Sequence, residues 1–398
     1  MEHSYSFCMR IDVGILGATG MVGQRYISLL ANHPWYRVAF VAASPASAGK
    51  RYGDAVTGRW RMHDTLSPEV ANLVITDAAD VGAGRGRCSL VFSCLEMGKD
   101  EVAALELAWA AAGHPVVSNS SAHRWTEDVP MIIPEINHAH AALIETQRRN
   151  RGFGSGLVAV KPNCSLQSWI TPVEALREAG FPVNRIMVTT FQAASGAGFP
   201  GVPSLDLIDN IIPLIGGEEE KTEREPLRIL GRLQGEGISL EANLVISASC
   251  NRVPVTDGHG AAVSLGFSGP KPSIEEAKRI FRNFRALPQE MGLPSAPAQP
   301  IVVREEIDRP QPARDRDAGG GMAVSVGRIR ECPLLDLRFF GMSHNTIRGA
   351  AGGGILTAEL LTRLGYIAES GATWTAELSL PASAIASMAR ARELVGCS

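Results

Sequence analysis

The feature that most constrains the fold is a glycine-rich turn between an apolar segment and an amphipathic segment near the start of the chain. Residues 11–16 are apolar and of strand length, Gly17-Ala18-Thr19-Gly20-Met21-Val22-Gly23 follows, and residues 21–31 carry apolar side chains at helical spacing. Glycine lets the backbone turn sharply and approach a pyrophosphate, whose charge is met by free N–H groups at a helix start. A turn that needs glycine only for packing is the alternative. The glycine-rich segment lies between a strand and a helix, and this position favours a dinucleotide-binding loop. We expect the loop to contact the cofactor through Gly17, Thr19, Gly20, Met21 and Val22.

The segments that follow alternate between strand and helix patterns. Residues 38–43, 90–93 and 115–118 are short apolar runs, and residues 100–112 have the pattern of a helix. This rhythm predicts an α/β fold in which a parallel Rossmann-type sheet has helices on both faces. Ser93 ends one of these runs, so we also expect it at the cofactor.

The pattern changes after residue 164. Residues 182–195 and 241–267 contain longer strand-like runs, separated by a helical stretch at 221–233, and residues 289–321 have the composition of a long surface loop. These features predict a second α+β domain with a mixed sheet. At 398 residues the chain is also too long for one ordinary core.

We therefore expect a dinucleotide-binding domain at 1–160 and a second domain at 161–340. The segment 341–367 should return to the first domain as a helix, and 368–398 forms a C-terminal extension, helical after Pro381, for which the sequence offers no function.

Composition excludes several functional classes. The net charge of −3 gives no footprint for nucleic acid, and no stretch of about 18 apolar residues could span a membrane. The seven cysteines are scattered and never in Cys-x-x-Cys spacing, which argues against a disulfide scaffold and a structural zinc site. The first ten residues do not have the pattern of a signal peptide. We expect a cytoplasmic protein without a metal.

Two motifs predict a thiol nucleophile. Lys161-Pro162-Asn163-Cys164-Ser165 places a cysteine in a turn, and Arg252-Val253-Pro254-Val255-Thr256-Asp257-Gly258-His259 places a histidine in another. A cysteine with a histidine partner is a candidate thiolate and base, although a lone cysteine is more often inert and a lone histidine more often only a satisfied polar group. With the dinucleotide loop, the pair indicates redox chemistry on an acyl group through a thioester. Cys94 and Cys250 fall in apolar strands and are expected to be core residues.

The loop after the second apolar run favours NADP over NAD. NAD-binding loops usually have an acid there for the ribose 2′-hydroxyl, but residues 42–50 contain none. Ser44, Ser47 and Lys50 could accept a 2′-phosphate that an acid would repel. An ordinary polar loop is the alternative.

Nine segments in order resemble the aspartate-semialdehyde dehydrogenases of the archaeal and fungal type, over roughly residues 9 to 367. They are GILGATGMVGQRY, SNSSAHRW, VPMIIPEIN, KPNCS, FQAASGAG, GGEEEK, RVPVTDGH, RPQPARDRDAGGGMAVSVGRIR and HNTIRGAAGG. The resemblance implies reduction of aspartyl 4-phosphate by NADPH, giving aspartate semialdehyde and phosphate. It also implies an NADP-binding domain at 1–160, a catalytic and dimerisation domain at 161–340, and a homodimer or homotetramer.

The resemblance also implies roles for individual residues. Cys164 would attack the acyl carbon, and His259 would take the thiol proton and later stabilise or protonate the tetrahedral species. The substrate residues would be Arg124 and Lys221 for phosphate, Arg252 for the α-carboxylate, Glu218 for the α-ammonium, Gln192 for the acyl group, and Asn163. Ser195, Gly196 and Asn345 would face the nicotinamide. For the acidic run at 218–220, a solvated helix start is the alternative.

Departures from the pattern leave other functions open. Ala46 stands about where many relatives have an arginine, and Gly260-Ala261 replaces a hydroxyl residue and an acid that often follow the histidine. The alternatives are a malonyl-CoA reductase, an N-acetyl-glutamyl-phosphate reductase-like enzyme, and a non-catalytic NADP-binding regulator. An amino-acid substrate needs both Glu218 and Arg252, whereas a malonyl group has no use for the acid.

Overall fold

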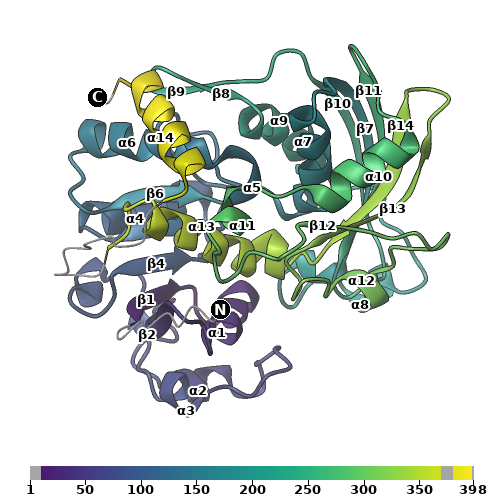
Figure 1. Cartoon of the computed structure of the whole chain (residues 1–398). Helices are drawn as coiled ribbons and strands as arrows, with labels where there is room; N and C mark the ends of the chain where they lie inside the picture. Colours follow the sequence, from purple (N-terminus) through teal and green to yellow (C-terminus); the bar gives the residue numbers. More distant parts are fainter. Residues whose placement is uncertain (1–9, 369–379, 397–398) are drawn as a thin grey trace, which may run out of the picture.

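The computed structural model describes residues 10–368 and 380–396 and contains two six-stranded sheets (Figure 1). The first sheet is parallel throughout and confirms the expected α/β domain. Its strands, in spatial order, are β3 (Thr76–Asp77), β2 (Tyr36–Ala43), β1 (Ile11–Leu16), β4 (Leu90–Ser93), β5 (Pro115–Ser118) and β6 (Leu157–Val160). The order reverses between β1 and β4, and ligands of such sheets bind beside that point, at the carboxyl ends of the strands.

Both faces of this sheet are covered, which explains its short, wholly apolar strands. In β4, Leu90 and Phe92 join one core and Val91 the other, because alternate side chains point to opposite faces. The first core contains side chains from α1 (Met21–Leu30) and α13 (Gly352–Arg363), and the second contains Val102 and Trp109 of α4 (Lys99–Ala111). The remaining elements of this domain are α2 (Tyr52–Val56), α3 (Pro68–Ala71), η1 (Val81–Gly84), α5 (Pro134–Asn137), η2 (His138–Ala142) and α6 (Leu143–Arg151).

The second sheet is mixed, as expected. Its strands, in spatial order, are β10 (Val245–Arg252), β7 (Val183–Gln192), β11 (His259–Phe267), β14 (Leu337–Ser343), β13 (Val324–Glu331) and β12 (Ile301–Val303). β10 and β12 pair parallel to their neighbours, and the three central pairings are antiparallel. The helices packed against it are α7 (Ile170–Glu178), α9 (Glu218–Ile229) and α10 (Ile274–Asn283).

Two segments differ from the sequence expectations. The expected loop at 289–321 contains β12 and α12 (Pro312–Asp315), because Ile301 is buried opposite Val324 and Asp315 forms ion pairs with Arg304 and Arg309. The helix expected at 221–233 begins earlier, at Glu218, and ends at Ile229. A hairpin of β8 (Arg232–Gln234) and β9 (Gly237–Ser239) follows it. The other short elements of this part are η3 (Cys164–Ser168), η4 (Ala194–Ala197), α8 (Ser204–Leu207) and α11 (Leu287–Glu290).

The C-terminal helices pack against elements of the first domain. After β14 the chain forms a π-helical turn, η5 (Ile347–Ala351), and then α13, which packs against α1 and β5 of the first domain near the centre of Figure 1. The helix expected after Pro381 is α14 (Ala382–Leu394), which packs on η2 and β8, with an ion pair from Arg392 to Glu145. The first part of the expected extension, 369–379, lies outside the described residues.

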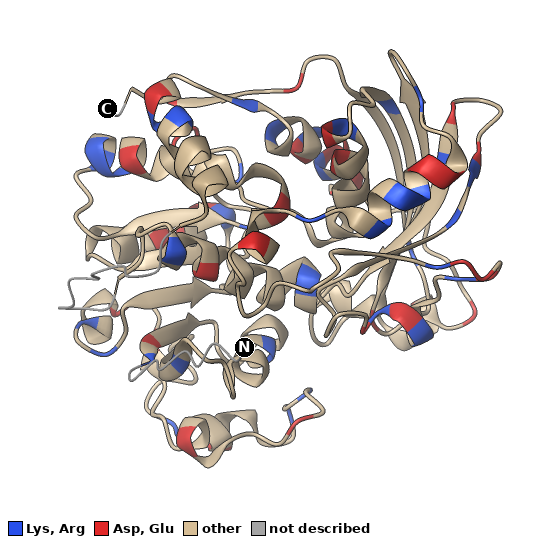
Figure 2. Ribbon diagram, in the orientation of Figure 1, with Lys and Arg blue, Asp and Glu red and all other residues tan. Residues whose placement is uncertain are grey.

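The distribution of charged side chains does not narrow the choice of function further. Figure 2 shows both signs interspersed over the elements visible in that view. Over residues 10–368 and 380–396, no helix has the combination of length and apolar character that crossing a bilayer requires.

Candidate active site

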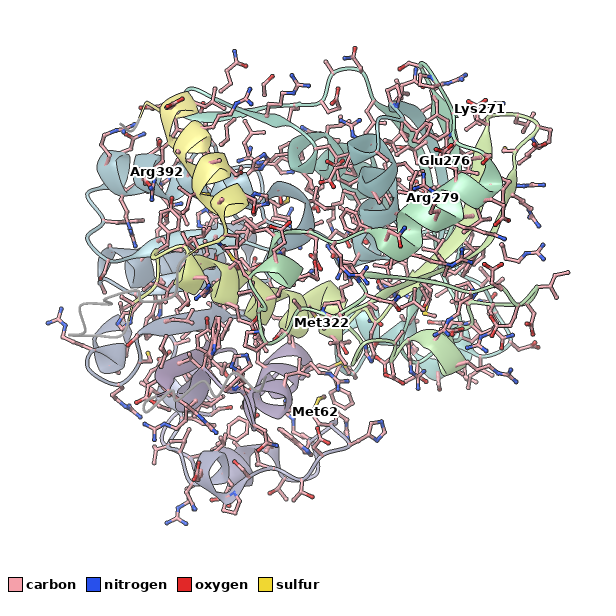
Figure 3. The ribbon with its side chains drawn as sticks, in the orientation of Figure 1. Met62, Lys271, Glu276, Arg279, Met322 and Arg392 are labelled. Atoms are coloured by element: carbon pink, nitrogen blue, oxygen red, sulfur yellow. The ribbon has the colours of Figure 1, made fainter. Side chains whose placement is uncertain are left out.

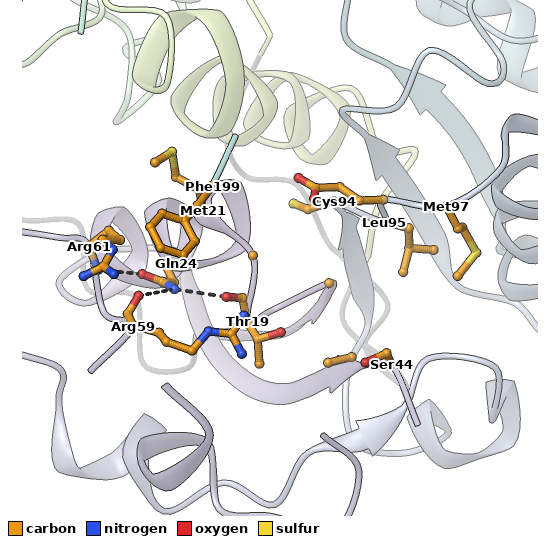
Figure 4. A pocket seen from close by; sticks show the side chains of 14 residues that line it. Thr19, Met21, Gln24, Ser44, Arg59, Arg61, Cys94, Leu95, Met97 and Phe199 are labelled. Atoms are coloured by element: carbon orange, nitrogen blue, oxygen red, sulfur yellow. Dashed lines mark hydrogen bonds between the residues drawn. The ribbon is translucent and has the colours of Figure 1, made fainter. Parts of the chain in front are cut away.

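A cavity of about 240 Å³ lies beside the glycine turn at the start of α1 (Figure 4). Gly17 has a φ of +80°, and a Cβ at this position would lie 2.4 Å from the Cys94 carbonyl oxygen. Glycine is therefore required where the backbone approaches the cavity. Of the expected cofactor residues, those that line the cavity are Gly17, Thr19, Gly20, Met21 and Ser44.

Seven expected cofactor residues do not line this cavity; Ser195, Gly196 and Asn345 lie near Cys164 instead, and the other four lie elsewhere in the first domain. Val22 packs on the apolar core beneath the helix, and Ser93 is fully buried in β4. The Lys50 ammonium donates a hydrogen bond to the Ala46 carbonyl of its own loop, and Ser47 lies half-buried in that loop.

Two arginines missed by the sequence reasoning line the same cavity. Arg59 and Arg61 are positioned through Gln24, whose side-chain amide donates to the Arg59 carbonyl and accepts from the Arg61 backbone N–H (Figure 4). The Arg61 guanidinium also lies 4.5 Å from the ring centre of Phe199, which comes from the second domain. No motif connects these arginines to the glycine turn, so only the fold brings them together.

Cys164 begins η3, just after β6 and at the carboxyl edge of the parallel sheet. The Asn163 side chain accepts a hydrogen bond from the Ser165 N–H, and the Asn163 N–H donates to Glu225. Glu225 also forms an ion pair with Arg124 (2.8 Å), whose guanidinium donates to the Lys161 carbonyl. These buried bonds fix the turn that presents the thiol.

His259 lies beside this thiol, with Nε2 3.4 Å from the Cys164 Sγ. The Ala193 N–H donates to the other ring nitrogen, Nδ1, at 3.0 Å. In a neutral imidazole one nitrogen accepts and the other carries the proton, so this bond places the proton on Nε2, facing the sulfur. Burial and the nearby Arg252 lower the pKa of His259 to about 3, so the ring is neutral at physiological pH.

Burial and neighbouring charges shift the pKa of the Cys164 thiol in opposite directions. Burial raises the pKa of Cys164 to about 11, and the charge of Glu218 acts in the same direction. The cations of Lys161, Arg124 and Arg252 oppose this increase. In this environment the thiol needs a neighbouring group to lose its proton at neutral pH.

Glu218, the first residue of α9, is surrounded by expected site residues. It accepts hydrogen bonds from the amides of Asn163 (2.8 Å) and Gln192 (3.3 Å) and forms an ion pair with Lys221 (2.7 Å). Burial alone would raise the pKa of the Glu218 carboxyl, but Lys221 and the two amides outweigh it and lower the pKa below the usual value. A charged carboxylate therefore faces the thiol.

Arg252, at the end of β10, lies close to the histidine. It donates to the Ala193 carbonyl at 2.8 Å. A Cβ at Gly196 would lie 2.9 Å from its Nη1 and 3.1 Å from the His259 Nε2, so a side chain at this position would crowd both groups.

The Asn345 side chain connects two loops at this site. It donates to the Ser195 hydroxyl and accepts from the Gly258 N–H, both at 2.8 Å. The structure thus gathers nearly all the expected catalytic and substrate residues around Cys164, with Arg124 buried behind the turn in its pair with Glu225.

Comparison with known proteins places this arrangement in a family. The chain is 45% identical over 358 residues to the aspartate-semialdehyde dehydrogenase of Archaeoglobus fulgidus, covering 89% of this chain and 99% of the relative. The same enzyme of Aspergillus fumigatus is 45% identical over 361 residues, covering 89% and 98%. The chain belongs to the aspartate-semialdehyde dehydrogenase family.

Family models and a solved structure agree with this membership. Residues 12–144 match the semialdehyde dehydrogenase NAD-binding domain, and residues 173–348 match the semialdehyde dehydrogenase dimerisation domain. A solved aspartate-semialdehyde dehydrogenase with NADP from Candida albicans is 40% identical, with a TM-score of 0.82, covering 90% of this chain and all of that one. Cys164 lies between the two family domains.

Proposed function

We propose that this protein interconverts aspartyl 4-phosphate and aspartate 4-semialdehyde with NADP, through a thioester on Cys164. The observation that supports it most is the meeting of Cys164, His259, Glu218 and Arg252 in one site of a member of this family. The thiol supplies the nucleophile, and the opposite charges match the α-ammonium and α-carboxylate of an amino acid.

The cavity beside the glycine turn fits NADP. Gly17 leaves no room for a side chain beside the turn, and the N–H groups at the start of α1 suit a pyrophosphate. When bound, the nicotinamide supplies or accepts the hydride. Ser44, Arg59 and Arg61 provide a hydroxyl and two cations for a 2′-phosphate, whereas Ser47 and Lys50 stay predictions. Ser195, Gly196 and Asn345 are proposed to position the nicotinamide.

On the substrate, the chain's own residues perform the steps. The Cys164 Sγ attacks the acyl carbon, the sulfur–carbon bond forms, and the bond from carbon to the phosphate oxygen breaks, while the thiol proton is transferred to the phosphate that leaves. The His259 Nε2–H stabilises the oxyanion as a hydrogen-bond donor, which its tautomer favours over the expected role of base. Gln192 orients the acyl group, Asn163 keeps Glu218 in place, and Lys221 is proposed for phosphate. For Arg124, phosphate binding stays a prediction.

Steady-state rates with two substrate pairs test this function. Aspartate semialdehyde with phosphate should support NADP reduction at least about a hundredfold faster than malonate semialdehyde with coenzyme A. Each substrate without its acyl acceptor is the control. A faster rate with the malonyl pair would favour the malonyl-CoA reductase alternative.

The cofactor preference gives one prediction. Replacing Arg59 with alanine should lower catalytic efficiency with NADPH by about tenfold, because a charge-assisted bond to the 2′-phosphate is lost. NADH lacks that phosphate, so its efficiency should change by less than about twofold. Kinetics with both cofactors for the unmodified protein and the variant measure this. An equal loss with both cofactors would mean that Arg59 has a structural role only.

Substrate charge gives a second prediction. Glu218→Gln should lower efficiency with aspartate semialdehyde by about one to two decades, because charge-assisted hydrogen bonds contribute roughly 1.5–3 kcal/mol. A des-amino analogue should be almost unaffected. Glu220→Gln, a half turn along the same helix and paired with Arg224 at the surface, is the matched control. If Glu218→Gln impairs both substrates equally, the acid does not bind the ammonium.

We also infer that the second domain forms a homodimer. The matching family model is a dimerisation domain, and the edge strand β10 and its neighbour β7 expose Val245 (68%) and Met187 (47%). Light scattering after size exclusion should give at least twice the chain mass.

A further inference from the structure

Glu106 is a buried carboxyl group on a helix face that otherwise packs into the core. The other buried residues of α4 are Val102, Trp109 and Ala110, which lie in the apolar core on one face of the first sheet. Glu106 is 0% exposed, and no ion pair in the described part of the chain includes it. A buried acid without a cation is costly, so its presence on this face requires an explanation.

Two serine hydroxyls at the edge of the parallel sheet lie beside this carboxyl. Ser93 and Ser118 are the last residues of β4 and β5 and are partners in the parallel pairing of these strands. The Ser118 hydroxyl accepts from the Ser120 N–H at 3.0 Å and donates to the Glu106 Oε1 at 2.6 Å. One oxygen of the carboxyl is therefore an acceptor, and the Ser118 proton is already used.

On the other side of the carboxyl two buried oxygen atoms are unpaired. Over residues 10–368 and 380–396, neither the Glu106 Oε2 nor the Ser93 Oγ has a hydrogen-bond partner. Burial raises the pKa of Glu106 above its usual value, and the hydroxyls of Ser118 and Ser93 offset only part of this increase. A carboxyl that keeps its proton can donate it to the Ser93 oxygen, which a carboxylate cannot do.

The groups nearest to Glu106 do not supply a compensating positive charge. The Cys94 thiol faces it from the end of β4, and burial, together with the charges of Glu96 and Glu106, raises the pKa of this thiol. Cys94 and Glu96 also line the cavity beside the glycine turn, where Figure 4 labels Cys94. A carboxylate behind this wall would repel the phosphates of a dinucleotide across poorly screened material. A neutral acid would not.

The two serines lie at strand ends that lead to the candidate site. Cys94, which lines the cavity, directly follows Ser93. The Ser118 carbonyl accepts a hydrogen bond from the Lys161 N–H at 2.8 Å, three residues before Cys164. A group that joins the two hydroxyls therefore fixes the backbone on the way to the cofactor cavity and to the nucleophile turn.

We propose that Glu106 is a neutral carboxylic acid that joins Ser93 to Ser118 and thereby positions the ends of β4 and β5 for cofactor binding. Its Oε2–H donates to the Ser93 Oγ, and its Oε1 accepts from the Ser118 hydroxyl. Glu106 is a positioning residue, because it lines neither the cavity nor the thiol site. The inference rests on the proposed function only in taking NADP as the ligand of the cavity.

Infrared spectroscopy of the full-length protein, without cofactor or substrate, tests the charge state. A protonated carboxyl has a C=O stretch that lies apart from the carboxylate and amide bands. At about pH 8, where ordinary acids are ionised, the difference between the unmodified protein and Glu106→Gln should contain this stretch. Glu174→Gln is the control, since burial raises the pKa of Glu174 only to about 7 and its difference spectrum should contain mainly carboxylate bands. A carboxylate band for Glu106 would overturn the proposal.

Titration with NADP in the absence of substrate tests the positioning role. Glu106→Gln keeps a neutral donor and acceptor in the same places, so the dissociation constant should change by less than about twofold. Glu106→Leu is similar in size but leaves two buried hydroxyls unpaired, so NADP should bind about tenfold more weakly. Glu276→Gln, at an acid that pairs with Arg279 on the surface of α10 (Figure 3), is the control and should have no effect.

Two results of this titration would contradict the proposal. Equal weakening in Glu106→Gln and Glu106→Leu would mean that a charged carboxylate is needed, and unchanged binding in Glu106→Leu would mean that the acid does not position the cavity. If Glu106→Leu does not fold, the glutamine variant and the infrared measurement still decide the charge state. Because neither experiment uses aspartate semialdehyde or phosphate, failure here is distinct from failure of the proposed reaction.

Discussion

Cys164→Ala is expected to abolish turnover, lowering the rate of NADP reduction with aspartate semialdehyde and phosphate by about five decades or more. Loss of a nucleophile that forms the covalent intermediate removes the whole pathway, and no other thiol lies beside His259 in the described residues. Cys164→Ser should retain little activity, because a hydroxyl is a far poorer nucleophile at neutral pH. The initial rate of NADPH absorbance measures both variants.

The matched control for this result is Cys88→Ala. Cys88 is a buried cysteine in the apolar core on one face of the first sheet, and it is not part of the candidate site. Its replacement by alanine should change the rate by less than about twofold. The alanine variant of Cys164 should still bind NADP. If it keeps more than about one-hundredth of the original rate, the thioester mechanism is wrong.

His259→Asn is expected to lower the maximal rate by about two to three decades with little change in KM. The lost group is a hydrogen-bond donor aimed at the developing oxyanion, and removal of one such donor has an effect of this size. Because burial lowers the pKa of His259 to about 3, the ring is already neutral, and the unmodified protein should show no inflection from imidazole near its ordinary pKa.

The rate at which iodoacetamide alkylates Cys164, measured against pH by peptide mass spectrometry, distinguishes the two roles of His259. If His259 only donates from Nε2, the midpoint of the rate–pH curve in His259→Asn should rise by about one unit or less, because one hydrogen bond to the thiolate is lost. A rise of about two units or more would mean that His259 removes the thiol proton.

The strands of the first domain could be predicted from the sequence because each is recognised from a short run of neighbouring apolar residues. The apolar runs at 11–16, 90–93 and 115–118 are strands with the expected bounds, since the strands of a covered parallel sheet are short and wholly apolar. The loop at 289–321 was predicted less well. Its strand Ile301–Val303 has three residues, and its position depends on pairing with Val324–Glu331 and not on its own composition.

In the candidate site, too, some features follow from local sequence motifs and others depend on contacts between distant segments. Cys164 and His259 occur in recognisable turns and meet at 3.4 Å. The tautomer of His259 depends on the Ala193 N–H, and the position of Arg59 depends on a hydrogen bond from Gln24. Neither of these contacts is set by spacing in the sequence, so only the folded chain reveals them.

Accumulation of the covalent intermediate tests the central claim most directly. The protein is mixed rapidly with aspartate semialdehyde and NADP in the absence of phosphate, quenched in acid and examined by peptide mass spectrometry. We predict a burst of NADPH of about one per chain and one aspartyl group on the peptide that contains Cys164, which phosphate added before the quench removes. An NADPH burst without an acyl group on Cys164, or an acyl group on another residue, would contradict the account.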